Sequence, residues 1–276
     1  MVNLAAIQLV SSPDPLENLA EVARQLQGLD KSSPCLVVLP ECFACFGGSD
    51  KAQLDMAETF GEGPVQSALA ELAIQHGVWL VAGTLPIKVP GKEKFSASSL
   101  LFAPSGEVFG HYRKIHLFDV QVADGTRTYL ESRYTQPGDE LVVADTPLGR
   151  IGMAVCYDLR FAGLFQAMGE LDILVLPAAF TQVTGEAHWW PLLRARAIEK
   201  QCFVVAAGQG GEHANGRETY GHSTVISPWG DVLTSLAKGP GLVQARVDFD
   251  QMREIRRNMP VGQHNQFRSK LIEFNS

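Results

Sequence analysis

One cysteine stands where the chain could do nucleophilic chemistry. Cys156 follows a run of small and apolar residues, 151–155, and a helical pattern begins near Arg160. Because α/β sheets place their sites at the carboxyl ends of strands, this turn would hold the thiol at the mouth of a site. The backbone N–H groups that follow, beginning with Tyr157, could then receive a developing oxyanion. Since a thiol with a pKa of about 8.5 is mostly protonated at neutral pH, such a nucleophile needs a base or a cation beside it.

Two polar residues at comparable strand ends could supply that help. Glu41 stands just past the end of the buried apolar run 35–39 and is followed by apolar residues, which suits a general base. Lys114 ends the predicted strand 108–114, where an ammonium group could stabilise an oxyanion. Either residue alone is more often solvated or salt-bridged. The prediction therefore rests on the joint appearance of the acid, the lysine and the cysteine.

Short apolar runs alternate with helical patterns along the chain, which is typical of an α/β fold. Asp14 and Pro15 supply a helix start, and a second helix is predicted from Pro64 to about His76 with Gly77 at its end. The first helix carries an apolar stripe at spacings of three and four, formed by Leu16, Leu19, Val22, Leu26 and Leu29. The predicted strands are residues 2–10, 35–39, 78–82, 96–103, 108–114, 150–155, 171–176, 203–207, 221–227, 232–237 and 241–248. The other predicted helices are at about 160–169, 186–201 and 249–258.

Two stretches far apart in the chain share one pattern. Residues 99–108 and 224–232 both have the pattern of a strand, a Pro-x-Gly-acid turn and a second strand, which is typical of a hairpin. The strand ends at 39–40 and 176–177 have a similar separation. We therefore expect two related α/β halves packed face to face within a single domain over residues 1–276.

The composition argues against several classes of protein. The 276 residues are 46% hydrophobic, enough for a sizeable core, and the formal charge of −7 with no basic block argues against nucleic acid or an anionic membrane as partner. The uncharged runs are too short or too interrupted to span a bilayer. Residues 1–7 have the pattern of a strand instead of a signal peptide, so we expect a soluble, cytoplasmic protein. Five cysteines, an odd number, do not indicate a disulfide framework.

Three segments resemble the motifs of the nitrilase superfamily of carbon–nitrogen hydrolases. They are residues 39–41, 113–117 and 155–161, and the resemblance runs from about residue 2 to about residue 265. It implies a four-layer αββα sandwich with two pseudo-symmetric halves, which uses no metal and no organic cofactor. One departure is Ala162-Gly163, where related proteins usually carry Pro-Glu, so we expect the helix there to begin less rigidly.

The same resemblance implies roles for four residues. Glu41 would be the general base, Lys114 the stabiliser of the oxyanion and Cys156 the nucleophile. Glu131 lies before the cysteine, where amidases of this family carry an additional active-site glutamate. It would position the substrate and the lysine.

The residues after the cysteine resemble those of Nit-type amidases instead of true nitrilases. Segments 187–189, 193–199, 220–223 and 239–242 resemble the branch that contains deaminated glutathione amidase. This implies a small-molecule amide substrate, deaminated glutathione, cleaved to 2-oxoglutarate and Cys-Gly. An ω-amidase that acts on 2-oxoglutaramate, or on another small carboxylate-bearing amide, is the alternative. The resemblance also implies a homodimer, with residues 193–198 near the subunit interface.

Candidate substrate-binding residues lie in two segments. Tyr157 and Arg160 follow the cysteine, and the others belong to the predicted loop 177–185 and the helix after it: Phe180, Thr181, His188 and Trp189. Both expected substrates carry a carboxylate, which a cation must meet, and Arg160 and Arg194 are the candidates. A buried structural ion pair is the other interpretation of each arginine, and it is favoured for Arg194. Core packing is the other interpretation of Trp189.

Two other functions stay open at this point. Cys42 and Cys45 form a Cys-x-x-Cys pattern of the kind found in redox and zinc sites, but no second pair or nearby histidine strengthens it. A binding protein without catalysis would be expected to have lost a motif residue, and none is lost. His116 could pair with Cys156, although the resemblance assigns the base to Glu41.

Overall fold

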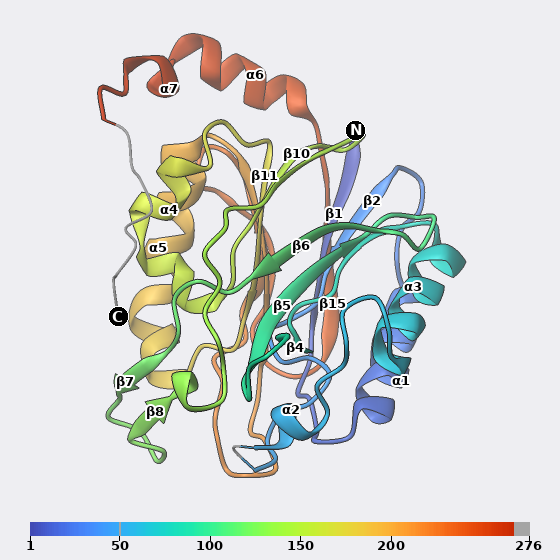
Figure 1. Ribbon diagram of the computed structural model, residues 1–276. Coiled ribbons are helices and arrows are strands. Elements are labelled where there is room, and N and C mark those ends of the chain that lie inside the picture. Colours follow the sequence, from blue (N-terminus) through green and yellow to red (C-terminus); the bar gives the residue numbers. More distant parts are fainter. Residues whose placement is uncertain (50, 268–276) are drawn as a thin grey trace.

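The computed structural model describes residues 1–49 and 51–267, and two mixed β-sheets face each other at its centre (Figure 1). The strands of the first sheet are β1 (Val2–Gln8), β2 (Cys35–Val38), β3 (Trp79–Val81), β4 (Leu85–Lys88), β5 (Phe95–Phe102), β6 (Val108–Arg113) and β15 (Gly241–Val247). Their order is β15-β1-β2-β3-β5-β4, with β6 also paired to β5.

The second sheet has six strands. They are β9 (Val143–Thr146), β10 (Gly149–Met153), β11 (Ile173–Ala178), β12 (Phe203–Gly208), β13 (Ser223–Ile226) and β14 (Val232–Leu236). Their order is β14-β13-β12-β11-β10-β9. A separate ribbon consists of β7 (Asp119–Gln121) and β8 (Thr128–Leu130) and projects at the lower left of Figure 1.

Helices cover the outer face of each sheet. Helices α1 (Pro15–Leu26) and α3 (Pro64–His76) lie outside the first sheet, and α4 (Ala162–Ala167) and α5 (Gln182–Lys200) lie outside the second (Figure 1). The layers are therefore α, β, β, α, which confirms the predicted sandwich. Helix α6 (Phe249–Asn258) runs across one end, and α2 (Ala52–Asp55) and α7 (Val261–His264) are single turns. Two further turns of 3₁₀ helix are Glu131–Arg133 and Cys156–Arg160.

The two sheets repeat one plan. In the first, β1, β2 and β3 are parallel and β5 is antiparallel to β3; in the second, β10, β11 and β12 are parallel and β13 is antiparallel to β12. Each sheet continues into a hairpin, β5-β6 or β13-β14, whose turn glycine, Gly106 or Gly230, has a positive φ. The related halves predicted from the repeated hairpin pattern are present in the structure.

The predicted helix ends follow from local chemistry. The Asp14 side chain accepts a hydrogen bond from the Leu16 N–H, and Pro15 opens α1. Helix α3 ends at Gly77, whose φ of 64° a glycine adopts without steric cost. The stripe on α1 is wrong at its first position, because Leu16 is 72% exposed while Val22 and Leu26 are fully buried.

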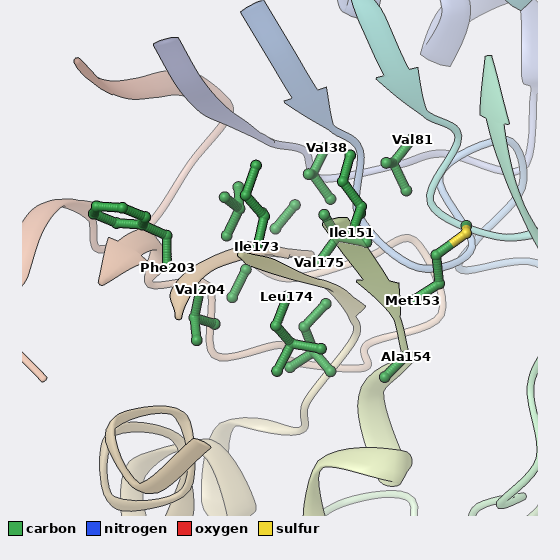
Figure 2. Packing of buried hydrophobic residues seen from close by; sticks show 14 of the residues in the cluster. Val38, Val81, Ile151, Met153, Ala154, Ile173, Leu174, Val175, Phe203 and Val204 are labelled. Atoms are coloured by element: carbon green, nitrogen blue, oxygen red, sulfur yellow. The ribbon is translucent and has the colours of Figure 1, made fainter. Parts of the chain in front are cut away.

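The space between the sheets is filled by side chains that alternate along each strand. Ile173 and Val175 of β11 face Val38 and Val81 of the first sheet, whereas Leu174 points the other way, toward the helices (Figure 2). Residues of both sheets belong to the same buried cluster. Docking of the sheets therefore fixes where the ends of their strands lie relative to each other.

Several short elements were not predicted, namely β4, the β7-β8 ribbon and β9. Strands β4 and β9 each pair with a single neighbour at a sheet edge, β5 and β10 respectively. In the part of the chain that the structure describes, no helix is long and apolar enough to cross a membrane.

Candidate active site

Four residues predicted from the sequence meet at one end of the two sheets. Lys114, which follows β6, lies with its Nζ 2.8 Å from Glu41 Oε1 and 2.8 and 2.9 Å from the two carboxylate oxygens of Glu131. Lys114 is only 2% exposed, and Glu41 is 5% exposed. Cys156 follows β10 of the opposite sheet and lines the same cavity. A buried ammonium thus bridges two carboxylates beside a thiol.

The backbone that carries Glu41 is held tightly. Gly83 has a φ of 53°, and a Cβ built on it would lie 1.9 Å from the Pro40 carbonyl oxygen, so no other residue fits there without moving Pro40. The Glu41 carbonyl accepts a hydrogen bond of 3.0 Å from Gln209 Nε2. Segments of both sheets therefore fix the position of the carboxylate.

The turn that carries Cys156 is strained and braced. Cys156 has a φ of 48°, in the left-handed region that costs a residue with a Cβ about 1–3 kcal/mol. Asp158, fully buried, accepts hydrogen bonds from the Val155 N–H at 2.9 Å and from the Tyr112 hydroxyl at 2.7 Å. It also accepts from the His116 N–H at 3.0 Å and lies 2.7 Å from His116 Nδ1. Asp158 therefore joins the cysteine turn to the segment that carries Lys114, and His116 contacts Asp158 instead of the thiol.

The surroundings of Cys156 keep its thiol protonated at rest. Burial raises the pKa of Cys156 well above its ordinary value, and the negative charge of the Glu41 carboxylate raises it further. Lys114 and the Ala179 N–H oppose this shift without reversing it. Nucleophilic attack by this sulfur consequently needs a base, and Glu41 is a carboxylate that lines the same cavity.

The lysine is held in its charged form. Burial alone would lower the pKa of Lys114, but the carboxylates of Glu131 and Glu41 outweigh it and raise that pKa well above its usual range. Burial raises the pKa of Glu131 against the lowering effect of Lys114. Glu131 also accepts a hydrogen bond of 2.6 Å from the Phe118 N–H. The Glu131 carboxylate is thus held in place beside the ammonium group that it shares with Glu41.

These groups open into a cavity of about 370 Å³, a size that suits a small molecule. Glu41, Lys114, Glu131 and Cys156 all line it. The cavity also takes residues from β8, from the segment before α2, from the segment before α5 and from the loop between β12 and β13. Polar and aromatic side chains share the lining, as expected of a site for a small polar ligand.

Comparison of the sequence with known proteins shows which protein family the chain belongs to. The sequence model described as "Carbon-nitrogen hydrolase" matches residues 3–257. The chain belongs to the carbon–nitrogen hydrolase family. A relative from Yersinia enterocolitica, named "Deaminated glutathione amidase", is 43% identical over 273 residues, which cover 98% of this chain and 95% of the relative. The family confirms the predicted class of enzyme, an amidase.

Solved structures of carbon–nitrogen hydrolases agree with the fold. The NitFhit protein of C. elegans has a TM-score of 0.87 at 35% identity, with 96% of this chain and 65% of that chain covered. Nit3 of Saccharomyces cerevisiae, a member of branch 10 of the nitrilase superfamily, has a TM-score of 0.84 at 29% identity, with 96% and 97% covered. The predicted membership of the nitrilase superfamily is confirmed.

Three of the predicted substrate-binding residues of this carbon–nitrogen hydrolase line the cavity. They are Tyr157, Arg160 and Phe180. The Arg160 guanidinium lies 5.2 Å from the centre of the Phe180 ring and 5.8 Å from that of Tyr157, so both rings contact the cation.

The other three predicted substrate-binding residues are not part of the cavity lining. Thr181 is 1% exposed and caps α5 by accepting a hydrogen bond from the Thr184 N–H, whereas Thr184 itself lines the cavity. His188 is exposed and lies 3.1 Å from Arg160 Nη1 through its Nδ1. Trp189 is fully buried and donates a hydrogen bond to the His222 carbonyl, so core packing, the other interpretation, describes it.

The Cys-x-x-Cys pair lies at the cavity without the surroundings of a metal site. Burial, together with the Glu41 carboxylate, raises the pKa of Cys42 to about 12, and burial raises the pKa of Cys45. Both are free thiols. Among residues 1–49 and 51–267, no group of three or more His, Cys, Asp or Glu side chains is placed to hold a metal ion.

Sequence reasoning missed Arg217, which lines the cavity from the loop between β12 and β13. His213 anchors this loop. It is 4% exposed, its Nδ1 lies 3.1 Å from the Ser11 carbonyl and its Nε2 lies 2.8 Å from Thr219 Oγ1. Burial, with a smaller effect from the Arg217 charge, lowers the pKa of His213 to about 4.

Replacing His213 with asparagine should reduce the loss of stability in acid. An unfolded histidine binds a proton near pH 6.5, whereas folded His213 binds one only near pH 4. Between these values the unfolded chain binds more protons than the folded protein. The free energy of unfolding of the wild type therefore decreases as the pH is lowered through that window, by up to about 3 kcal/mol. Urea unfolding at pH 7.5 and pH 4.5 measures this for both proteins. Equal losses of stability in the wild type and the variant would contradict the expectation.

Proposed function

We propose that this carbon–nitrogen hydrolase cleaves deaminated glutathione to 2-oxoglutarate and Cys-Gly through a thioester on Cys156. The observation that carries the proposal is the buried Lys114 ammonium, bridging Glu41 and Glu131 beside a protonated thiol. The choice of substrate is supported by the name of the Yersinia enterocolitica relative, at 43% identity. We also propose that residues 1–276 form a single domain that needs neither metal nor organic cofactor.

In the first half of the proposed reaction, Glu41 takes the thiol proton as the Cys156 sulfur attacks the amide carbon. The oxyanion that forms accepts hydrogen bonds from Lys114 Nζ and the Tyr157 N–H. Glu41 then gives its proton to the leaving nitrogen, the C–N bond breaks and Cys-Gly departs. The acyl group remains on the sulfur as a thioester.

In the second half, water replaces the leaving amine. Glu41 takes a proton from the water as its oxygen attacks the thioester carbon, and Lys114 again stabilises the oxyanion. The C–S bond then breaks, 2-oxoglutarate leaves as a carboxylate and Cys156 regains its proton. Glu131 holds the ammonium group in place throughout and is a positioning residue.

Arg160 is the proposed partner of the carboxylate next to the keto group. It lies four positions after the nucleophile and lines the cavity with its guanidinium against two rings. An arginine can bind a carboxylate through two parallel hydrogen bonds, which fixes its orientation as well as its position.

The proposed assembly is a homodimer, and the proposed location is the cytoplasm. The dimer is supported by exposed apolar side chains near the end of α5: Ile198 is 53% exposed, Trp229 57% and Leu233 44%. A Cβ built on Gly230 would lie 2.9 Å from Ile198, so the hairpin turn and the helix end form one surface. Such apolar surfaces commonly mark contacts between proteins.

The experiment that tests the function compares two amides by one readout. Deaminated glutathione and 2-oxoglutaramate both yield 2-oxoglutarate, so glutamate dehydrogenase with excess ammonium and NADH reports on each. We expect kcat/KM to be at least about tenfold higher for deaminated glutathione, which corresponds to roughly 1.4 kcal/mol of additional transition-state binding. Faster turnover of 2-oxoglutaramate would instead support the alternative, an ω-amidase, and turnover of neither would overturn both.

A further inference from the structure

Arg217 is held in an aromatic clamp at the cavity. Its guanidinium lies 4.8 Å from the centre of the Phe46 ring and 4.7 Å from that of Tyr129. Its Nε is buried, and within residues 1–49 and 51–267 it has no hydrogen-bond partner. A buried donor without a partner is energetically costly, so this N–H is available to donate a hydrogen bond to an acceptor on a bound ligand.

The clamp is one end of a continuous wall of rings. From Arg160 the contacts run to Tyr157 at 5.8 Å, to Phe118 at 5.1 Å, to Tyr129 at 5.1 Å and then to Arg217 at 4.7 Å. All five residues line the same cavity. A guanidinium group thus stands at each end of the wall, and the one at Arg160 is four residues from the nucleophile.

The segment that carries Arg217 is fixed before any ligand binds. The His213 N–H donates a 2.9 Å hydrogen bond to the Arg217 carbonyl, and the Arg217 N–H donates to the Asn215 side chain. The His213 ring contacts Phe46 edge to face at 4.3 Å, so the anchor of the loop also supports one side of the clamp. A cation held in this way loses little side-chain entropy when it binds an anion.

The charges of the cavity favour a ligand with more than one anionic group. Its lining carries the cations Lys114, Arg133, Arg160 and Arg217, against the carboxylates of Glu41 and Glu131. Lys114 is already paired with both carboxylates. Arg160 and Arg217 therefore remain as two guanidinium groups of the lining, one at each end of the wall of rings, that can each bind an anionic group of a ligand.

We infer that Arg217 binds a carboxylate on the leaving-group side of the scissile amide, so that the cavity selects amides with an anion at each end. The inference rests on the proposed function, because it takes Arg160 as the partner of the acyl-side carboxylate. In deaminated glutathione the second anion is the glycine carboxylate, and 2-oxoglutaramate has no counterpart to it. Arg217 is therefore a specificity-determining residue.

Three substrates and one variant test the inference. We compare kcat/KM of the wild type and Arg217→Gln on deaminated glutathione, on its glycine carboxamide and on 2-oxoglutaramate. Loss of a charged hydrogen-bond partner should lower kcat/KM for deaminated glutathione about 10- to 100-fold and change the other two less than about twofold. Arg217→Lys should recover part of the loss, and Arg253→Gln, on the surface of α6, is the matched control for removal of an arginine.

Two outcomes would overturn the inference. An equal loss on all three substrates would mean that Arg217 acts through folding or through the acyl side, and no loss on deaminated glutathione would mean that it binds nothing there. Calorimetric titration of Cys156→Ser with deaminated glutathione and its carboxamide separates this inference from the proposed function. If the wild type hydrolyses neither amide, the proposed function is wrong. The inference about Arg217 then stands only if Cys156→Ser binds deaminated glutathione at least about tenfold more tightly than its carboxamide. That difference must also disappear in the double variant that carries Arg217→Gln.

Discussion

Replacing Cys156 with alanine should abolish amide hydrolysis and leave the fold in place. The sulfur is the proposed site of the thioester, and no other group at the cavity replaces it, since the pKa of Cys42 is raised to about 12. The expected loss in kcat is on the order of 10⁴-fold or more, as for removal of other nucleophiles that act with a base. Turnover of deaminated glutathione by the purified variant measures it.

Cys35→Ala is the control for Cys156→Ala. Cys35 is 3% exposed at the start of β2 and lies outside the cavity lining, so this variant should lose about 1 kcal/mol of stability and keep its activity. Mass spectrometry of acid-quenched wild type should also show an acyl group on Cys156. Unchanged turnover by Cys156→Ala would exclude the proposed mechanism.

Replacing Lys114 with methionine should damage both activity and stability. The variant leaves Glu41 and Glu131 buried with no cation between them, and removing one partner of a buried ion pair costs about 3–5 kcal/mol. It also removes the proposed charge at the oxyanion, for which a loss of about 10³-fold in kcat is expected. Steady-state kinetics and urea unfolding at neutral pH measure the two effects.

The stability cost of Lys114→Met should depend on pH in a defined direction. Burial raises the pKa of Glu131, and the charge of Lys114 is the largest effect that lowers it. Removing the ammonium group should therefore raise the pKa of Glu131 further. A raised carboxyl pKa in the folded state means that the native protein takes up a proton more readily than the unfolded chain, so the variant should regain stability as pH falls. Lys88→Met removes an exposed lysine from the end of β4 and should change neither property. Full activity in Lys114→Met would rule out its proposed role.

Much of the fold could be predicted because it is determined locally. The Asp14 cap and Gly77 at the end of α3 act on their own helix termini, and buried parallel strands such as β11 are apolar throughout. Strand β4 is different, because it contains Pro86 and is held at the edge of the sheet by pairing with β5 and by backbone hydrogen bonds to Glu58. This strand forms because it pairs with other segments of the chain, and its own residues carry no pattern that predicts a strand.

The candidate site also combines residues that local sequence patterns reveal with residues that only the folded structure brings together. Glu41, Lys114 and Cys156 could be proposed from the sequence because each stands at, or close after, the end of a predicted strand. The burial of Trp189 was also readable, since Trp189, Leu193 and Ala197 recur every four residues and all are fully buried. Arg217 could not be found in this way, because the rings that clamp it come from distant segments of the chain.

The candidate active site lies across the interface between the two sheets and takes residues from both. Glu41 and Lys114 follow strands of the first sheet, whereas Cys156 follows a strand of the second, so neither half of the molecule holds both the proposed base and the proposed nucleophile. A small sliding of one sheet over the other would separate the thiol from its base while every strand remained paired. We therefore expect such a displacement to lower amide turnover while probes of secondary structure remain unchanged.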